Sequence, residues 1–269
     1  MKTPSGTRIF FFSLFAGIMA LVIALGGVHA QDWRTASREP VGLAPDPAAT
    51  PEALVQVYSA RAWNWRGYFG VHTWIAVKPA RAGAYTVYEV IGWRLRSNES
   101  ALAIHDRAPD GRWFGNAPEL LAEKRGDGVD ALIARIDKAA REYPYAGEYT
   151  VWPGPNSNTF TAWVARAVPE LELDLPPTAI GKDYLRDRVV ASAPSGSGLQ
   201  LSLFGLLGVL ASGVEGLEIN VLGLTFGIDP YPLAIKLPLV GRLGLATQNA
   251  YAAGERTAGN PMPQKQGRP

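Results

Sequence analysis

Two stretches of the sequence carry side chains that could act together in nucleophilic chemistry. Ser157 follows Asn156 in a Pro-Gly-Pro-Asn-Ser turn that is expected to open a helix, so its hydroxyl would face the positive end of the helix. There the Ser157 amide and the Asn156 side chain could donate hydrogen bonds to an oxyanion. His72 lies near the start of the β-type segment Gly70–Val77 and could remove the serine proton, if the fold brings the two side chains together. This pattern indicates acyl or amide chemistry.

Each of these residues also has a purely structural interpretation. Asn and Ser are preferred at helix N-caps, where a cap stabilises by about 1 kcal/mol. A single histidine in a half-buried strand is commonly a hydrogen-bonded core residue. Both interpretations stay open at the level of sequence. Elsewhere, His105 is expected in a solvent-exposed polar loop, and Glu215 and Glu218 in a solvated turn rather than a carboxylate dyad.

The segments that must position these residues change from strand-like to helical spacing along the chain. Strand-like segments cover residues 54–60, 70–78, 84–91 and 148–152. A polar, irregular stretch is expected over residues 94–119. Helical spacing predicts a helix over residues 129–143, with Asp127 as its N-cap and Pro144 as its end, and a second helix from the Asn156 turn to about Val168. Strands followed by helix, strand and helix predict an α+β domain.

The C-terminal part of the chain is apolar and rich in glycine. No charged residue occurs from Val189 to Val214. Within it, Leu199–Val214 is too short for a bilayer span, so it is expected to form a buried hairpin or helix, or to contact a membrane. Leu217–Ile228 and Leu233–Val240 flank an Asp-Pro-Tyr-Pro turn and predict two further strands.

The N-terminal residues have the features of an export signal. Lys2 and Arg8 precede the apolar run Ile9–Val28, and Val28-His29-Ala30 fits a signal-peptidase site before Gln31. The run is also long enough for an uncleaved membrane anchor. Either alternative exports the rest of the chain, to the periplasm or another extracytoplasmic compartment.

We therefore divide the chain into five parts. They are a signal peptide or anchor (1–30), a linker (31–53), an α+β domain (54–190), an apolar β-rich extension (191–250) and a flexible tail (251–269).

Composition excludes several classes of function. The 26 Lys and Arg nearly balance the 24 Asp and Glu, which argues against a nucleic-acid partner. The chain has no cysteine, so disulfides, thiolate-bound metals and thiol catalysis are excluded. With three histidines and no phosphate-binding or dinucleotide motif, neither a metal nor another cofactor is expected.

Residues 54–168 resemble the permuted papain-like fold of the lecithin:retinol acyltransferase-like proteins and the NlpC-type amidases. The likeness consists of a strand led by histidine, a second strand, a helix, and a helix start of the type Asn-Cys-x-x-Phe. It implies that His72 is the general base, that Tyr149 and Asn156 are flanking positions, and that Phe160 is the buried aromatic. Ser157 stands where that family has its cysteine.

Serine in place of cysteine changes the chemistry that this likeness implies. A serine hydroxyl is far less acidic than a thiol, so it needs a true general base that a third group orients. In the related fold the adjacent strand supplies that group. Glu89 is the candidate here, with Tyr85 or Tyr88 as alternatives.

A second resemblance covers most of the exported chain. The stretches Trp152–Trp163, Leu175–Tyr184 and Lys236–Arg242 resemble a bacterial domain-of-unknown-function family, number 3750 in that series. It implies a shared architecture and no established activity.

Three functions follow as expectations. The first is an exported serine-variant hydrolase or acyltransferase acting on amide or ester bonds of lipids or peptidoglycan peptides. The second is an inactive papain-like module that binds an envelope component, a membrane surface or a membrane complex. The third is a structural membrane protein whose C-terminal apolar region is the working part.

Overall fold

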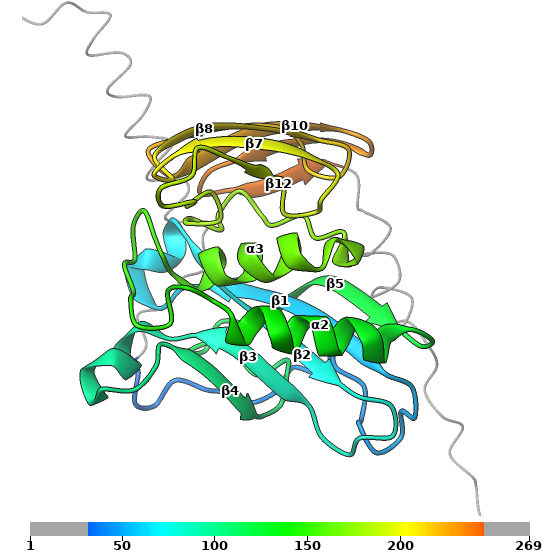
Figure 1. The fold of residues 1–269 in the computed structure, drawn as a ribbon. Helices are drawn as coiled ribbons and strands as arrows, with labels where there is room; N and C mark the ends of the chain where they lie inside the picture. The colour runs from blue at the N-terminus through cyan, green and yellow to red at the C-terminus, as the bar shows by residue number, and fades with distance from the viewer. Residues whose placement is uncertain (1–31, 245–269) are drawn as a thin grey trace, which may run out of the picture.

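The computed structural model describes residues 32–244. Two antiparallel sheets enclose a layer of helices (Figure 1). The expected signal or anchor (1–30) and the expected tail (251–269) lie outside the described residues. Within residues 32–244, no helix is both long enough and apolar enough to cross a bilayer.

The first sheet has five strands in the order β4-β3-β2-β1-β5. Its strands are β1 (Leu54–Arg61), β2 (Val71–Lys78), β3 (Thr86–Val90), β4 (Leu102–Asp106) and β5 (Glu119–Arg125). Branched and aromatic residues dominate β1 and β2, which are buried along almost their whole length. Strands with this pattern are covered on both faces, and each face of this sheet carries its own apolar core.

Side chains alternate between these two cores along each strand. Val57 and Ile75 belong to the core under the helices α2 (Val129–Arg141) and α3 (Ser157–Ala167). Tyr58 and Trp74 belong to the opposite core. That core is closed by residues 36–44 and by the loop that carries Trp113 and Phe114.

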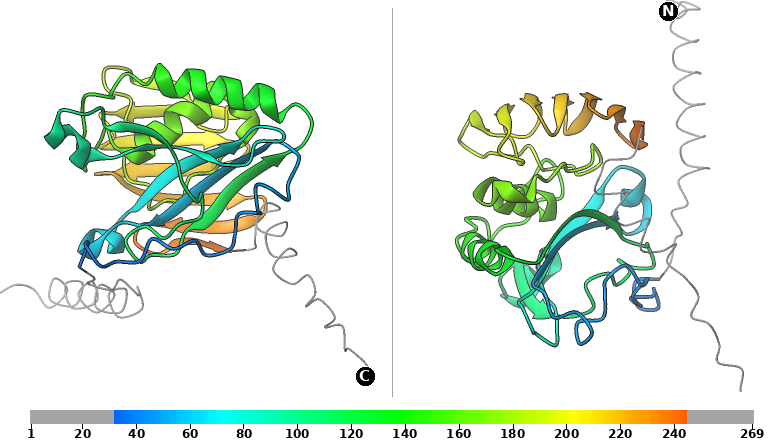
Figure 2. Two further views of the ribbon diagram at one scale, coloured as in Figure 1. Left: turned by 90° about the horizontal axis from the view of Figure 1, so that it is seen from below. Right: turned by 90° about the vertical axis from the view of Figure 1, so that its right-hand side faces the viewer.

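The second sheet is a meander of seven strands on the far side of α3 (Figure 2). In sequence order its strands are β6 (Val190–Ser192), β7 (Gly198–Leu203), β8 (Leu207–Ser212), β9 (Gly216–Val221), β10 (Leu224–Pro230), β11 (Leu233–Leu237) and β12 (Gly241–Gly244). Each strand pairs with its neighbour in the chain, so the connections are short turns.

The α+β class is confirmed at the level of antiparallel sheets with a few helices. Several segment predictions are wrong. Residues 94–119 contain strand β4 and the start of β5, whose polar residues concealed them, and residues 148–152 form no strand. Gly128, not Asp127, is the N-cap of α2.

Two longer segments also differ from expectation. The expected linker is not free where the structure describes it, because Ala36, Leu43 and Ala44 pack against the core around Trp74. The stretch 217–228 is two strands, β9 and β10, rather than one. The stretch 199–214 is the hairpin of β7 and β8, but most of its leucines are exposed instead of buried, with Leu210 as the buried exception.

Candidate functional site

The five-stranded sheet separates the residues that the sequence brought together as a catalytic group. Thr73 points toward α3, where its hydroxyl is within hydrogen-bond distance of Asn158 Oδ1 (3.0 Å) and Thr161 Oγ1 (2.8 Å). His72, the preceding residue of β2, points to the opposite face. There its ring stacks on Trp113, with centroids 3.7 Å apart. The expected Ser157–His72 pair is therefore wrong: the two side chains lie on opposite faces of the sheet.

Asn156 and Ser157 form the start of α3. Asn156 is its N-cap, with Oδ1 accepting hydrogen bonds from the amides of Asn158 and Thr159. The side-chain nitrogen of Asn156, Nδ2, donates hydrogen bonds to the carbonyls of Val151 (3.1 Å) and Ile180 (3.0 Å). Both of its N–H groups are thus used, and none is left for an oxyanion.

Ser157 is the first residue of the helix and is buried. Its backbone has a structural role, since its carbonyl accepts hydrogen bonds from the hydroxyls of Thr73 and Thr161. Phe160, the buried aromatic that the papain-like resemblance implies, is fully buried in the core beside Tyr143. The capping interpretation of this turn agrees with these contacts.

On the opposite face, Glu89 is the centre of a buried polar cluster. Its side chain is within hydrogen-bond distance of His72 Nε2 (2.9 Å), His105 Nε2 (2.7 Å) and Arg107 Nε (3.2 Å). Burial by itself would raise the pKa of the Glu89 carboxyl, but the hydrogen bonds from His105 and His72 outweigh it and hold that pKa well below its usual range. Glu89 is therefore ionised.

The same cluster fixes the state of His72. Burial lowers the pKa of His72 more than the hydrogen bond to Glu89 raises it, so the ring is neutral. A neutral ring beside an ionised carboxylate donates its Nε2 proton to it. Among residues 32–244, Glu89 is the hydrogen-bond partner of this side chain, and Trp74 and Trp113 cover its faces. Glu89 is hydrogen-bonded to the His72 ring, and no serine hydroxyl is within hydrogen-bond distance of the pair in this part of the chain.

His105 and Arg107 were missed by the sequence analysis. His105 lies in β4 rather than in a loop, opposite Val87 of β3, and reaches Glu89 while its own side chain stays 42% exposed. The matching alternation of β3 and β4 is the signal that places these residues on one face. No group of three His, Asp or Glu residues in the described chain is placed to hold a metal ion.

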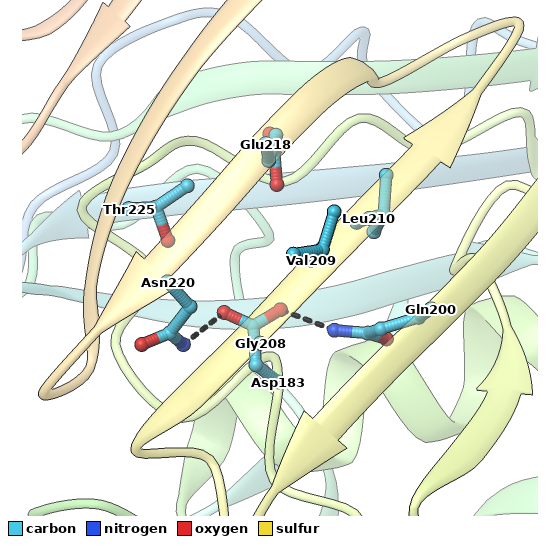
Figure 3. A pocket seen from close by; sticks show the side chains of 8 residues that line it. All are labelled: Asp183, Gln200, Gly208, Val209, Leu210, Glu218, Asn220 and Thr225. Atoms are coloured by element: carbon cyan, nitrogen blue, oxygen red, sulfur yellow. Dashed lines mark hydrogen bonds between the residues drawn. The ribbon is translucent and has the colours of Figure 1, made fainter.

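A second polar cluster lies between α3 and the inward face of the seven-stranded sheet. Glu218 of β9 is bound by Lys182 and by Lys236 of β11, whose Nζ lies 2.9 Å from Glu218 Oε1 and 2.6 Å from Asp174. Nearby, the Asp183 carboxylate bridges the side-chain amides of Gln200 and Asn220 (Figure 3). The expectation that Glu215 and Glu218 are solvated is wrong, since both are buried.

The outward face of this sheet has the opposite chemistry. Five charged residues occur between residues 190 and 244, and their side chains are buried or turned inward: Glu215, Glu218, Asp229, Lys236 and Arg242. The exposed side chains of the strands are apolar, apart from Ser192 of β6, and lie in register across them. One row runs Leu201–Val209–Ile219–Phe226, and another runs Leu199–Ala211–Leu217–Ile228–Ile235–Leu243. We call this surface the outward apolar face.

Comparison with known proteins gives a family and no closer relative. No curated protein and no solved structure matches the chain. A family model described as "Protein of unknown function (DUF3750)" matches residues 52–184. The match spans the first sheet and both helices and includes the stretches Trp152–Trp163 and Leu175–Tyr184, whereas Lys236–Arg242 and the second sheet lie outside it. The chain belongs to this family of proteins of unknown function, DUF3750.

Proposed function

We propose that this protein is a membrane-surface module of the cell envelope, and that its outward apolar face lies on a lipid bilayer. One observation carries the proposal: every charged residue of the seven-stranded sheet is turned away from that face, and the side chains left outside are apolar except for Ser192 at the edge strand β6. Water-facing sheets of soluble proteins have the reverse arrangement, with polar residues outside.

The size of the face supports this role. Seven strands about 4.8 Å apart, each with about five residues rising about 3.4 Å, present roughly 600 Å² of flat surface. The largest apolar patch of a typical soluble monomer covers about 300–600 Å². The flat area of this face alone reaches the upper limit of that range, and the side chains that project from it add further apolar surface. The backbone of a sheet interior is already hydrogen-bonded, so the face can contact lipid without unsatisfied amides.

The rest of the sequence favours a bilayer as the occupant. The apolar run Ile9–Val28 ends just before the first described residue, and either alternative for it, signal or anchor, takes the chain to a membrane. After β12, residues 245–269 contain Arg256, Lys265 and Arg268 against Glu255, which suits an anionic lipid surface. Tyr231, 89% exposed at the β10–β11 turn, is a residue type that is frequent at membrane interfaces.

We infer that the chain has a papain-like scaffold but does not catalyse the reaction of that fold. A strand that carries His72 and a helix that opens at Asn156-Ser157 support that ancestry. The positions of the two side chains on opposite faces favour a binding module over a hydrolase or acyltransferase. The same proposal places the protein outside the cytoplasm, held at the membrane that it contacts.

Vesicle flotation tests the proposal. The chain from Gln31 is the material of choice, because both sheets and both cores lie within residues 32–244. It should float with vesicles that contain phosphatidylglycerol. Val209→Asp with Ile219→Asp places two carboxylates on neighbouring strands of the face and should reduce the bound fraction about tenfold or more, because each charge must lose water.

The control is Trp65→Asp, an exposed aromatic on the short 3-10 helix η1 (Asn64–Tyr68), which is not part of the outward apolar face. It should float as the unmodified chain does. Equal flotation of the double variant would refute the proposal. A chain that ignores vesicles but forms dimers by light scattering, with the dimer lost in the double variant, would show that a second copy covers the face instead.

A further inference from the structure

A cleft of about 680 Å³ remains between the two sheets. Helices α2 and α3 lie toward one side of the space between the sheets (Figure 2). The cleft lies under β10–β12, where its floor is formed by the ends of β1 and β5 and by residues 172–178. Its volume is within the range of about 300–1,000 Å³ that is typical of small-molecule sites.

Arg61, the last residue of β1, is the distinctive group in this cleft. Its Nη1 donates to the carbonyls of Gly67 and Leu239, both at 3.2 Å. Among residues 32–244, no carboxylate lies within ion-pair distance of its guanidinium. Burial lowers the pKa of Arg61, and Glu119 only partly offsets this effect. A partly buried guanidinium with further N–H donors is suited to a carboxylate or phosphate.

Most of the carboxylates that line the cleft are neutralised by other cations. The pairs are Asp229 with Arg242 (2.8 Å), Asp174 with Lys236 (2.6 Å) and Glu172 with Lys124 (2.7 Å). Glu119 remains, and it lies at the exposed rim on β5, where water screens its charge. Inside the cleft, Arg61 is therefore the charge that a ligand can neutralise.

Apolar side chains form one part of the remaining walls, beside the polar Ser59 and Thr178. Val71 of β2 and Leu121 of β5 line the floor, and Pro176 and Val240 line the sides. Polar and apolar surface thus meet in one cavity, which is the arrangement that an amphiphile requires.

We propose that the cleft binds an amphiphile with one anionic head group, a carboxylate or phosphate held by Arg61, and a hydrocarbon chain along Val71, Leu121, Pro176 and Val240. The inference goes beyond the membrane-surface function and does not depend on it, because the cleft lies on the inward side of the sheet.

A fluorescent fatty acid, 11-(dansylamino)undecanoic acid, titrated into the chain from Gln31 without vesicles tests the proposal. Saturable binding is expected, with competition by dodecanoate and dodecyl phosphate. Neither inorganic phosphate nor dodecyltrimethylammonium should compete at the same concentrations. Displacement by inorganic phosphate alone, or equally by the cationic amphiphile, would overturn the proposal.

Arg61→Gln should weaken binding about tenfold or more, because the amide keeps donors for the two carbonyls but lacks the charge. Arg66→Gln, an exposed arginine on η1, is the matched control and should bind as the unmodified chain does. Unfolding temperatures of both variants show that the fold persists. Equal affinity of Arg61→Gln and the control would refute the site.

The variant Val209→Asp with Ile219→Asp separates this proposal from the membrane-surface function. It should still bind the probe, because the outward apolar face is not part of the cleft. Loss of probe binding in this variant, with Arg61→Gln unaffected, would assign the probe to the outward apolar face and overturn the cleft site.

Discussion

The two sheets of this protein use the same strand pairing and opposite distributions of polarity. Strands β1 and β2 are buried on both faces, between two apolar cores. In the seven-stranded sheet, burial alternates residue by residue, and most of the buried residues are polar. Alternation in a sequence therefore tells which side chains share a face. It does not tell which of the two faces the protein covers.

The helix layer explains the reversal in the second sheet. α3 and the turn after it present Arg166, Lys182 and Asp183 to the inward face. On the strands, Gln200 is hydrogen-bonded to Arg166 and Asp183, and Glu218 is hydrogen-bonded to Lys182. A buried charge is tolerated only when it is paired and hydrogen-bonded. The inward positions of the strands must then be polar, and the apolar positions are left outside.

Removing the centre of the inward polar cluster should have the largest effect on stability. Glu218→Ala leaves Lys182 and Lys236 without the carboxylate they share, and we expect the free energy of unfolding to fall by about 3–5 kcal/mol. Urea denaturation measures the change. Glu170→Ala, which removes an exposed partner of Arg135, is the control and should cost about 1 kcal/mol or less. Similar losses in both variants would mean that the inward face is hydrated.

The same substitution, isoleucine to alanine, should have different effects on the stability of the two sheets. Ile75 of β2 is fully buried, whereas Ile219 of β9 is 48% exposed. Ile75→Ala should lower the free energy of unfolding by about 2–5 kcal/mol because it leaves a cavity. Ile219→Ala should change it by about 0.5 kcal/mol or less. A large loss at Ile219 in urea denaturation would show that something already covers the outward apolar face.

Two buried carboxyl groups should give the two regions opposite pH dependences. The low pKa of Glu89 means that its contribution to stability is present above about pH 4.5 and is lost as the pH falls further. Burial raises the pKa of Asp174 to about 7 despite Lys236. The folded protein therefore holds a proton that the unfolded chain has released, and stability falls as the pH rises from about 4 to 7.

Urea denaturation between pH 3 and 8 checks both signs. Glu89→Gln should flatten the acidic part of the curve, and Asp174→Asn should flatten the part between about pH 4 and 7. If the Asp174→Asn curve keeps its fall toward pH 7, another group is responsible for that slope.

The smallest expected effect concerns the two faces of the first sheet. Because His72 points away from Ser157, a fluorophosphonate probe should not label the chain. Ser157→Ala should also change stability little, by about 1 kcal/mol or less. Mass spectrometry of the treated protein checks this. Labelling that disappears in both Ser157→Ala and His72→Ala would contradict the opposite placement of the two residues.

Much of the first sheet was predictable from the sequence, because β1, β2 and β3 consist of uninterrupted β-type residues and α2 and α3 have clear helical spacing. The face of His72 was not predictable. His72 shares its face with Trp74 and Ala76, and Thr73 shares its face with Ile75 and Val77. Since both sets are apolar, the pattern cannot tell which of them meets α3.

The prediction for the second sheet was wrong for a different reason. Glu218 and Asn220 alternate with Leu217, Ile219 and Val221, and the ordinary interpretation of that pattern assigns the polar residues to water. Lys182 and Asp183, which bind Glu218 and Asn220 and so reverse the assignment, lie more than thirty residues earlier and carry no local signal. Only the assembled layers bring them together.

The inward polar cluster also sets an order of assembly. The cations and carboxylates that β6–β12 must meet come from residues 166–183, which precede those strands in the chain and are anchored by α3 and the turn after it. In a polypeptide that emerges N-terminus first, the five-stranded sheet can be complete before the meander begins to form. If that sheet and α3 fold as they emerge, the meander closes onto a base that is already formed. In that order, the outward apolar face is completed after the residues of both apolar cores are already folded away.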